Sequence, residues 1–85
     1  MKIIDLKKII EHLPDDMEII IQKDSEGNDF SPLSEVDDNC IYIPDSTWSG
    51  DVYSKEFSAD DMLMSEERWE ELKKKPSVCV LVPVN

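Results

Sequence analysis

The stretch that follows Pro76, SVCVLVPV at residues 77–84, constrains the fold most strongly because it is apolar at almost every position. Alternation along a strand would place four valines on one face and Cys79 and Leu81 on the other. Strands that are apolar on both faces are typical of positions covered on both sides. The sequence therefore predicts a central strand here, with Cys79 in the core.

Two segments carry helical signals. Apolar residues at 6, 9, 10 and 13 follow the i, i+3, i+4, i+7 pattern of an amphipathic helix, with Asp5 as its N-cap and Pro14 as its end. A second helix is predicted from the N-cap Ser65 to residue 75, because acids cluster at its start and lysines at its end. Trp69 and Leu72 are three residues apart in it and are expected to face the core.

Three other segments have the composition of strands. Residues 17–23 (MEIIIQK) are β-branched, residues 30–36 are interrupted by Pro32 and are expected to be short or at an edge, and residues 40–43 end at Pro44. Val52 and Tyr53 are also expected to be extended. The chain is therefore predicted to be a single α+β domain over residues 1–85. It would be a small two-layer domain with two helices packed on a three- to four-stranded, mainly antiparallel sheet.

Residues 24–29 admit two interpretations. Asp24, Glu26, Asn28 and Glu35 partly match a calcium-binding EF-hand loop, whereas position 6 of that loop is Asp29 rather than glycine. A strand rather than a helix is predicted before it. We expect a β-turn, with Gly27 and Asn28 left-handed, and no metal site.

The charge is concentrated in the middle of the chain. The net charge is −11, and residues 24–61 contain eleven acids and only one base, Lys55. Such a field repels nucleic acid and favours basic protein surfaces, although it also serves solubility. We take Asp37, Asp38, Asp60 and Asp61 as the candidate acidic surface. No apolar run is long enough to span a membrane, so no membrane association is expected.

Catalytic motifs are missing from the sequence. The single histidine, His12, lies on the polar side of the first predicted helix with no nucleophile near it. No phosphate-binding glycine loop, CxxC or HxxxH pattern occurs, and Cys40 and Cys79 are expected to be small buried hydrophobes in a reducing environment. We therefore predict no catalytic residue, no cofactor and no enzymatic activity.

The loop PDSTWSGDVY at residues 44–53 places a large aromatic among short polar residues. Trp48 is either a core plug whose indole turns inward or an exposed anchor flanked by adaptable hydroxyls, and we favour the anchor. The candidate binding residues are Tyr42, Asp45, Ser46, Thr47, Trp48, Ser49, Gly50 and Tyr53.

Three segments together carry a resemblance. EGNDFSPL at 26–33, YIPDSTWSGDVY at 42–53 and the closing VCVLVPVN at 78–85 resemble a group of small accessory proteins of tailed bacteriophages, which also begin with a short helix ending in Leu-Pro, as Leu13-Pro14 does here. The similarity spans nearly the whole chain. It implies an accessory product that acts in the cytoplasm of the infected bacterium, and it transfers no catalytic residue.

Proteins of this kind without enzymatic motifs are expected to act by binding. The first hypothesis is inhibition of a host or anti-phage defence protein through the acidic segment and the Trp48 loop. The alternative is a sponge for a nucleotide-like signalling molecule that stacks on an aromatic side chain, which the negative field disfavours. A structural role ranks third, and homo-oligomers are possible because an exposed strand edge could pair with its twin.

Overall fold

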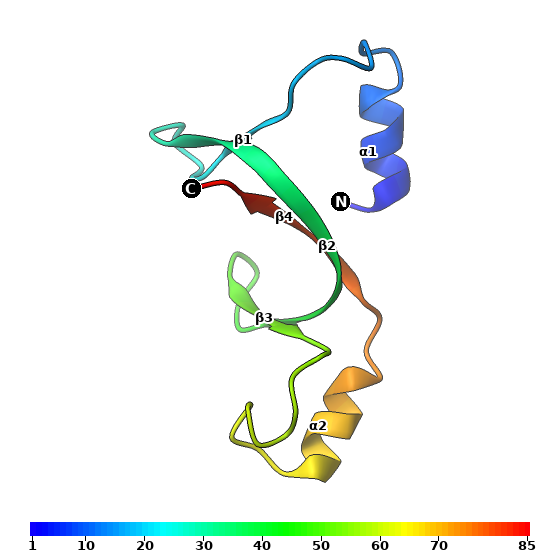
Figure 1. Ribbon diagram of the computed structural model, residues 1–85, viewed down its shortest axis with the longest axis vertical. Helices are drawn as coiled ribbons and strands as arrows, with labels where there is room; N and C mark the ends of the chain where they lie inside the picture. The colour runs from blue at the N-terminus through cyan, green and yellow to red at the C-terminus, as the bar shows by residue number, and fades with distance from the viewer.

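One long strand organises the whole molecule (Figure 1). The computed structural model describes residues 1–85, in the order α1 (Ile3–Ile10), β1 (Ile20–Gln22), β2 (Phe30–Pro44), β3 (Gly50–Ser54), α2 (Glu66–Lys73) and β4 (Val78–Pro83). Every strand pair is antiparallel and every other strand pairs with β2. The prediction of a small α+β domain with a mainly antiparallel sheet is confirmed.

Strand β2 pairs with a different partner along each part of its length. Residues 30–32 pair with β1, residues 33–40 with β4 and residues 40–44 with β3. The register with β4 shifts between Leu33 and Glu35 and again between Asp37 and Cys40, and such bulges let a strand bend. The two short strands predicted at 30–36 and 40–43 are therefore one strand of 15 residues, and Pro32 lies within it.

The core lies at the carboxyl end of β2. Ile41, Ala59 and Trp69 are buried together, and partly buried side chains of β3, α2 and the segment before α2 pack against them. The Trp69 indole donates a hydrogen bond to the carbonyl of Phe57 at 2.8 Å. Helix α2 begins as predicted, because the Ser65 hydroxyl accepts a hydrogen bond from the Arg68 N–H at 3.2 Å.

The amino-terminal half has almost no core. Helix α1 contributes no buried residue, and Asp5 accepts a hydrogen bond from the Lys2 backbone from within the first turn rather than as the N-cap. The strand predicted at 17–23 is limited to the three residues of β1. Ser31 is the one fully buried residue before Cys40.

Strand β4 is an edge strand, so the prediction of a central strand is wrong. It pairs only with β2, and Cys79 and Leu81 are exposed on one of its faces. The prediction that Cys79 is buried is therefore also wrong, whereas Cys40 is buried as expected. The apolar pattern shows that this face of β4 can be covered, but the chain covers it only in part.

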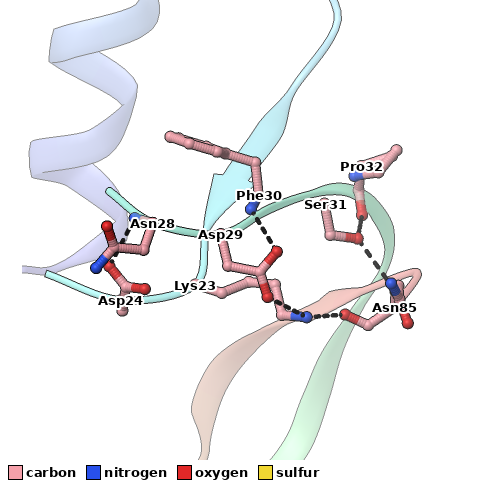
Figure 2. A network of polar contacts seen from close by, with 8 residues as sticks. All are labelled: Lys23, Asp24, Asn28, Asp29, Phe30, Ser31, Pro32 and Asn85. Carbon is pink, nitrogen blue, oxygen red and sulfur yellow. Dashed lines mark hydrogen bonds and ion pairs between the residues drawn. The ribbon is translucent and has the colours of Figure 1, made fainter. Parts of the chain in front are cut away.

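A polar network fastens the carboxyl end of the chain to the β1–β2 hairpin (Figure 2). The Ser31 hydroxyl accepts a hydrogen bond from the Asn85 N–H at 3.1 Å and donates to the Pro32 carbonyl at 2.9 Å. Lys23 binds the Asn85 backbone oxygen and forms an ion pair with Asp29 at 3.2 Å. These contacts hold the end of β4 in register beside β2.

The molecule is elongated, with principal extents of 46, 27 and 24 Å. The core and α2 occupy one end, and α1 lies toward the other (Figure 1). Neither helix is long and apolar enough to cross a membrane.

Candidate functional site

The Trp48 loop, residues 45–49, connects β2 to β3 at one end of their hairpin. Pro44 pairs with Gly50 at the last register position before the loop, and five paired positions hold the two strands together below it. The loop therefore stands on a regular hairpin that is anchored in the core through Ile41.

Three polar side chains hold the loop in one shape. The Ser46 hydroxyl oxygen accepts hydrogen bonds from the backbone N–H groups of Trp48 at 3.3 Å and Ser49 at 3.1 Å. The Ser49 hydroxyl donates to the Asp45 carboxylate at 2.6 Å, and the backbone N–H groups of Asp45 and Ser46 both donate to the Ser49 carbonyl. The side-chain hydrogen bonds of these three residues are thus made inside the loop.

Trp48 projects from this loop into solvent. Its exposed fraction is 86%, whereas that of Trp69 is 2%. The Trp48 backbone N–H is bonded within the loop, and its indole makes no hydrogen bond to the chain. The interpretation of Trp48 as a core plug does not fit this geometry, because its ring contributes nothing to the buried cluster.

Tyr42 and Gly50 support the base of the loop. A Cβ atom on Gly50 would lie 2.6 Å from the Ile43 carbonyl oxygen and 2.7 Å from the Tyr42 ring, so the ring sits directly against the glycine. Glycine is needed here for close approach, because any side chain would collide with the backbone. Tyr42 is 40% exposed.

Tyr53 does not join this group. It pairs with Ile41 across the hairpin, and paired residues share a face, so its ring points to the core side and packs against the buried cluster. Thr47 remains exposed and its hydroxyl is bonded to nothing in the chain. The structure therefore brings together Tyr42, residues 45–49 and Gly50, and places Tyr53 among the structural residues.

The four acidic candidates have different surroundings. Asp37 accepts a hydrogen bond from the Asn39 backbone at 2.9 Å, and Asp61 accepts one from the Ser58 backbone at 2.9 Å. That bond from Ser58 lowers the pKa of the Asp61 carboxyl below its ordinary value of 3.8. Asp38 and Asp60 are exposed, so these two carboxylates are free for a partner.

The turn at 24–29 is a structural turn. One Asp24 carboxylate oxygen accepts a hydrogen bond from the backbone N–H group of Glu26 at 2.9 Å. The same oxygen accepts a second bond from the backbone N–H group of Asn28 at 3.1 Å (Figure 2). The bond from Asn28 is the main reason that the pKa of Asp24 is lowered. Gly27 is left-handed, with φ of 79°, and Asn28 is not. No cluster of three or more metal-ligating side chains occurs in the molecule.

Leu63 is an exposed residue that the sequence did not identify. It is 93% exposed and adopts φ of 54°, a conformation that a branched side chain rarely takes. Met62, its neighbour, packs against the core instead. Helical periodicity could not predict which of Met62 and Leu63 is buried, because residues 58–64 form a turn rather than a helix.

Comparison of the chain with protein-family models, with curated proteins and with solved structures finds no match. The function of the chain is therefore inferred from the chemistry of its surface.

Proposed function

We propose that this chain is a non-enzymatic accessory protein, of the phage type that its sequence resembles, that binds and inhibits a host or anti-phage defence protein. The contact would be anchored by Trp48. The proposal rests on the exposure of that indole. Trp48 is 86% exposed, and its loop needs no aromatic side chain for its own packing. Binding energy in protein complexes is concentrated in a few aromatic and arginine anchors that enter pockets on the partner.

The internal hydrogen bonds of the loop support this role. Because Asp45, Ser46 and Ser49 already fix the backbone around Trp48, little loop entropy remains to be lost on binding. A rigid loop that presents a tryptophan with two rotatable side-chain bonds is the arrangement that binding surfaces favour.

The charge around the loop indicates the chemistry of the partner. Asp45 lies in the loop and Asp51 lies just after it, within a segment that carries eleven acids and one base over residues 24–61. A complementary partner would offer an apolar pocket for the indole with lysine and arginine side chains at its rim. Such charge complementarity mainly accelerates association and selects against acidic competitors.

A nucleotide-like ligand is the less favoured alternative. The exposed Trp48 ring could stack on a base. However, the Ser46 hydroxyl, which together with Thr47 and backbone N–H groups would hold a phosphate, already accepts two hydrogen bonds within the loop. The neighbouring Asp45 carboxylate would repel the anion.

The test compares two variants of matched exposure. The tagged protein, Trp48→Ala and the control Leu63→Ala are used to capture proteins from bacterial lysate, and the affinity for each captured protein is then measured with purified components. Leu63 is as exposed as Trp48 and lies in another loop. We expect Trp48→Ala to weaken binding by about 2 kcal/mol, roughly thirtyfold, and Leu63→Ala to leave it nearly unchanged.

The dependence of the association rate on salt tests the role of the acidic segment in the same complex. The association rate should fall as salt is added, whereas the dissociation rate should change little. Equal capture by the wild type and Trp48→Ala would exclude the Trp48 loop as the anchor, and an association rate independent of salt would remove the acidic segment from the mechanism.

A further inference from the structure

A second surface, on the other half of the molecule, is apolar and uncovered. Thirteen of the eighteen exposed large apolar residues lie in residues 1–36 or in the segment that begins with β4. One part of this apolar area lies between the beginning of α1 and β4, and we call it the α1–β4 surface. It comprises the exposed side chains of Ile3, Val36, Cys79 and Leu81, and it continues along α1 to Ile10, which lies two turns after Ile3 on the same side of the helix.

The geometry of this surface is a groove between a helix and a strand. A cavity of about 480 Å³ is lined by the first residues of α1, including Ile3 and Leu6, and by β4 residues that include Cys79 and Leu81. Val36 pairs with Leu81 across the sheet, so both side chains lie on the same face. Both are about half exposed, at 55% and 46%.

The chain exposes more surface than a compact monomer of its mass. A compact protein of 9.8 kDa has an accessible surface of about 5,200 Å², whereas this chain exposes 7116 Å². Its radius of gyration is 15.7 Å, against about 12 Å for a compact chain of this length. The excess surface, about 1,900 Å² per chain, falls in the range that each subunit buries in an obligate homodimer.

Helix α1 requires a packing partner as well. It has eight residues and buries none of them, and isolated helices shorter than about 12 residues are marginal in water. Its Ile3, Ile9 and Ile10 side chains are 50%, 61% and 43% exposed. Apart from the half-buried Leu6, the apolar surface of α1 is therefore left for a partner to cover.

The distribution of charge permits a second copy at this surface. Residues 1–23 contain four lysines and five acids, and residues 76–85 contain no charged side chain, so two such surfaces would repel each other weakly. Asp37, which follows Val36 in β2 and pairs with Val80, points to the opposite face. The Asp37 carboxylate is thus directed away from the face that Val36 and Leu81 share.

We propose that a second copy of this chain covers the α1–β4 surface and forms a symmetric homodimer through it. Each copy would place its α1 and the Cys79–Leu81 face of β4 against the same surface of the other. The Trp48 loop would remain free in both copies, so this proposal is independent of the proposed function. A dimer would present two Trp48 loops.

The test is the oligomeric state of the purified chain, measured by sedimentation and light scattering between about 1 and 100 µM. We expect a species of twice the 9.8 kDa chain mass. Leu81→Glu should raise the dimer dissociation constant by about tenfold or more. Val52→Glu is the matched control, because Val52 is 45% exposed, also lies in a strand, and receives the same charge on the other half of the molecule. It should change the constant by less than about twofold.

Two further measurements test the dimer independently of any effect of Leu81→Glu on the sheet. Ile10→Glu lies in α1, outside the core, and should dissociate the dimer without unfolding the chain even if Leu81→Glu disturbs the sheet. The exposed Cys79 thiol should react with a thiol reagent more slowly as the protein concentration rises. A wild-type monomer throughout this range, or a dimer that Leu81→Glu and Ile10→Glu leave intact, would overturn the proposal.

Discussion

Replacing each tryptophan in turn separates the structural indole from the binding indole. Trp69 is 2% exposed, packs with Ile41 and Ala59, and donates its N–H to the Phe57 carbonyl. Removing a core aromatic of this size costs about 3–5 kcal/mol, and the Phe57 carbonyl left without its partner adds about 1 kcal/mol. A domain of 85 residues has a total stability of about 4–13 kcal/mol, so Trp69→Ala should remove at least about a third of it, and all of it at the lower limit.

Trp48→Ala should behave differently because the ring contacts almost nothing. With 86% of its surface exposed, its deletion should change the free energy of unfolding by no more than about 0.5 kcal/mol. Urea denaturation followed by far-ultraviolet circular dichroism measures both variants without depending on tryptophan emission. A loss of stability in Trp48→Ala as large as that in Trp69→Ala would refute the assignment of Trp48 as an anchor.

Fluorescence provides an independent control on the same two residues. The chain has two tryptophans, so each single Phe variant reports on one indole. In Trp69→Phe the remaining emission should be quenched by acrylamide almost as readily as that of a free indole, whereas in Trp48→Phe the emission should be protected. Equal quenching in the two variants would contradict the difference in burial.

Three other substitutions test local geometry. Gly50→Ala should destabilise the hairpin by about 1–3 kcal/mol in urea melts, because its Cβ would lie 2.6 Å from the Ile43 carbonyl oxygen, and an unchanged midpoint would contradict this. Leu63→Gly should stabilise the chain by about 0.5–1 kcal/mol. The left-handed conformation of Leu63 costs about 1–2 kcal/mol, which glycine does not incur, and the greater freedom of glycine in the unfolded state offsets part of that gain. A lower melting temperature would refute that. The pKa values of Asp24 and Asp61 are lowered in the folded chain, so their stabilising effect is complete above the ordinary value of 3.8 and is lost as the pH falls through the folded values. Asp61→Asn should therefore lose less stability than the wild type on acidification, and equal losses would show that the Ser58 bond has no role.

The elements that sequence reasoning identified are those with local signals. Helix α2 has its cap at Ser65, its acids first and its lysines last, and Trp69 lies at core spacing, so its place and its buried residue were both predicted. The turn at 24–29 was predicted for the same reason, because Asp24 and Gly27 fix it through bonds within four residues. Such features depend on neighbours in the chain and can be inferred from it.

The errors concern contacts between distant parts of the chain. Pro32 and the Asp37-Asp38-Asn39 run suggested breaks, yet β2 passes through both, with bulges next to them that absorb the irregularity. The apolar alternation in β4 predicted cover on both faces, and Cys79 and Leu81 are exposed. A sequence reveals which faces are apolar, but it does not reveal whether the same chain covers them.

The loop around Trp48 and the exposure of its indole were predicted correctly, but the orientation of its hydroxyl groups was not. Composition suggested that the hydroxyls of Ser46 and Ser49 face a ligand, and instead they bond within the loop and to Asp45. Hydroxyl groups of short side chains often bind nearby backbone groups, and composition alone does not distinguish this from an outward orientation. Of the loop hydroxyls, that of Thr47 remains free.

Because all three other strands pair with β2, different parts of this one strand should unfold at different free energies. The β2–β3 hairpin and α2 are close in sequence and surround the core, whereas β4 reaches β2 residues more than about 35 positions earlier in the chain. The carboxyl end of β2 lies in the core and its pairing with β3 is local, so it should act as the folding nucleus. The Phe30 end pairs with β1 just as locally, but it has almost no buried side chains, so it should be the last part of the strand to become stable. In native-state hydrogen exchange, the amides of residues 40–43 should consequently be the slowest in β2, with protection decreasing along the strand toward β1. One strand would then contain both the most and the least persistent hydrogen bonds of the sheet.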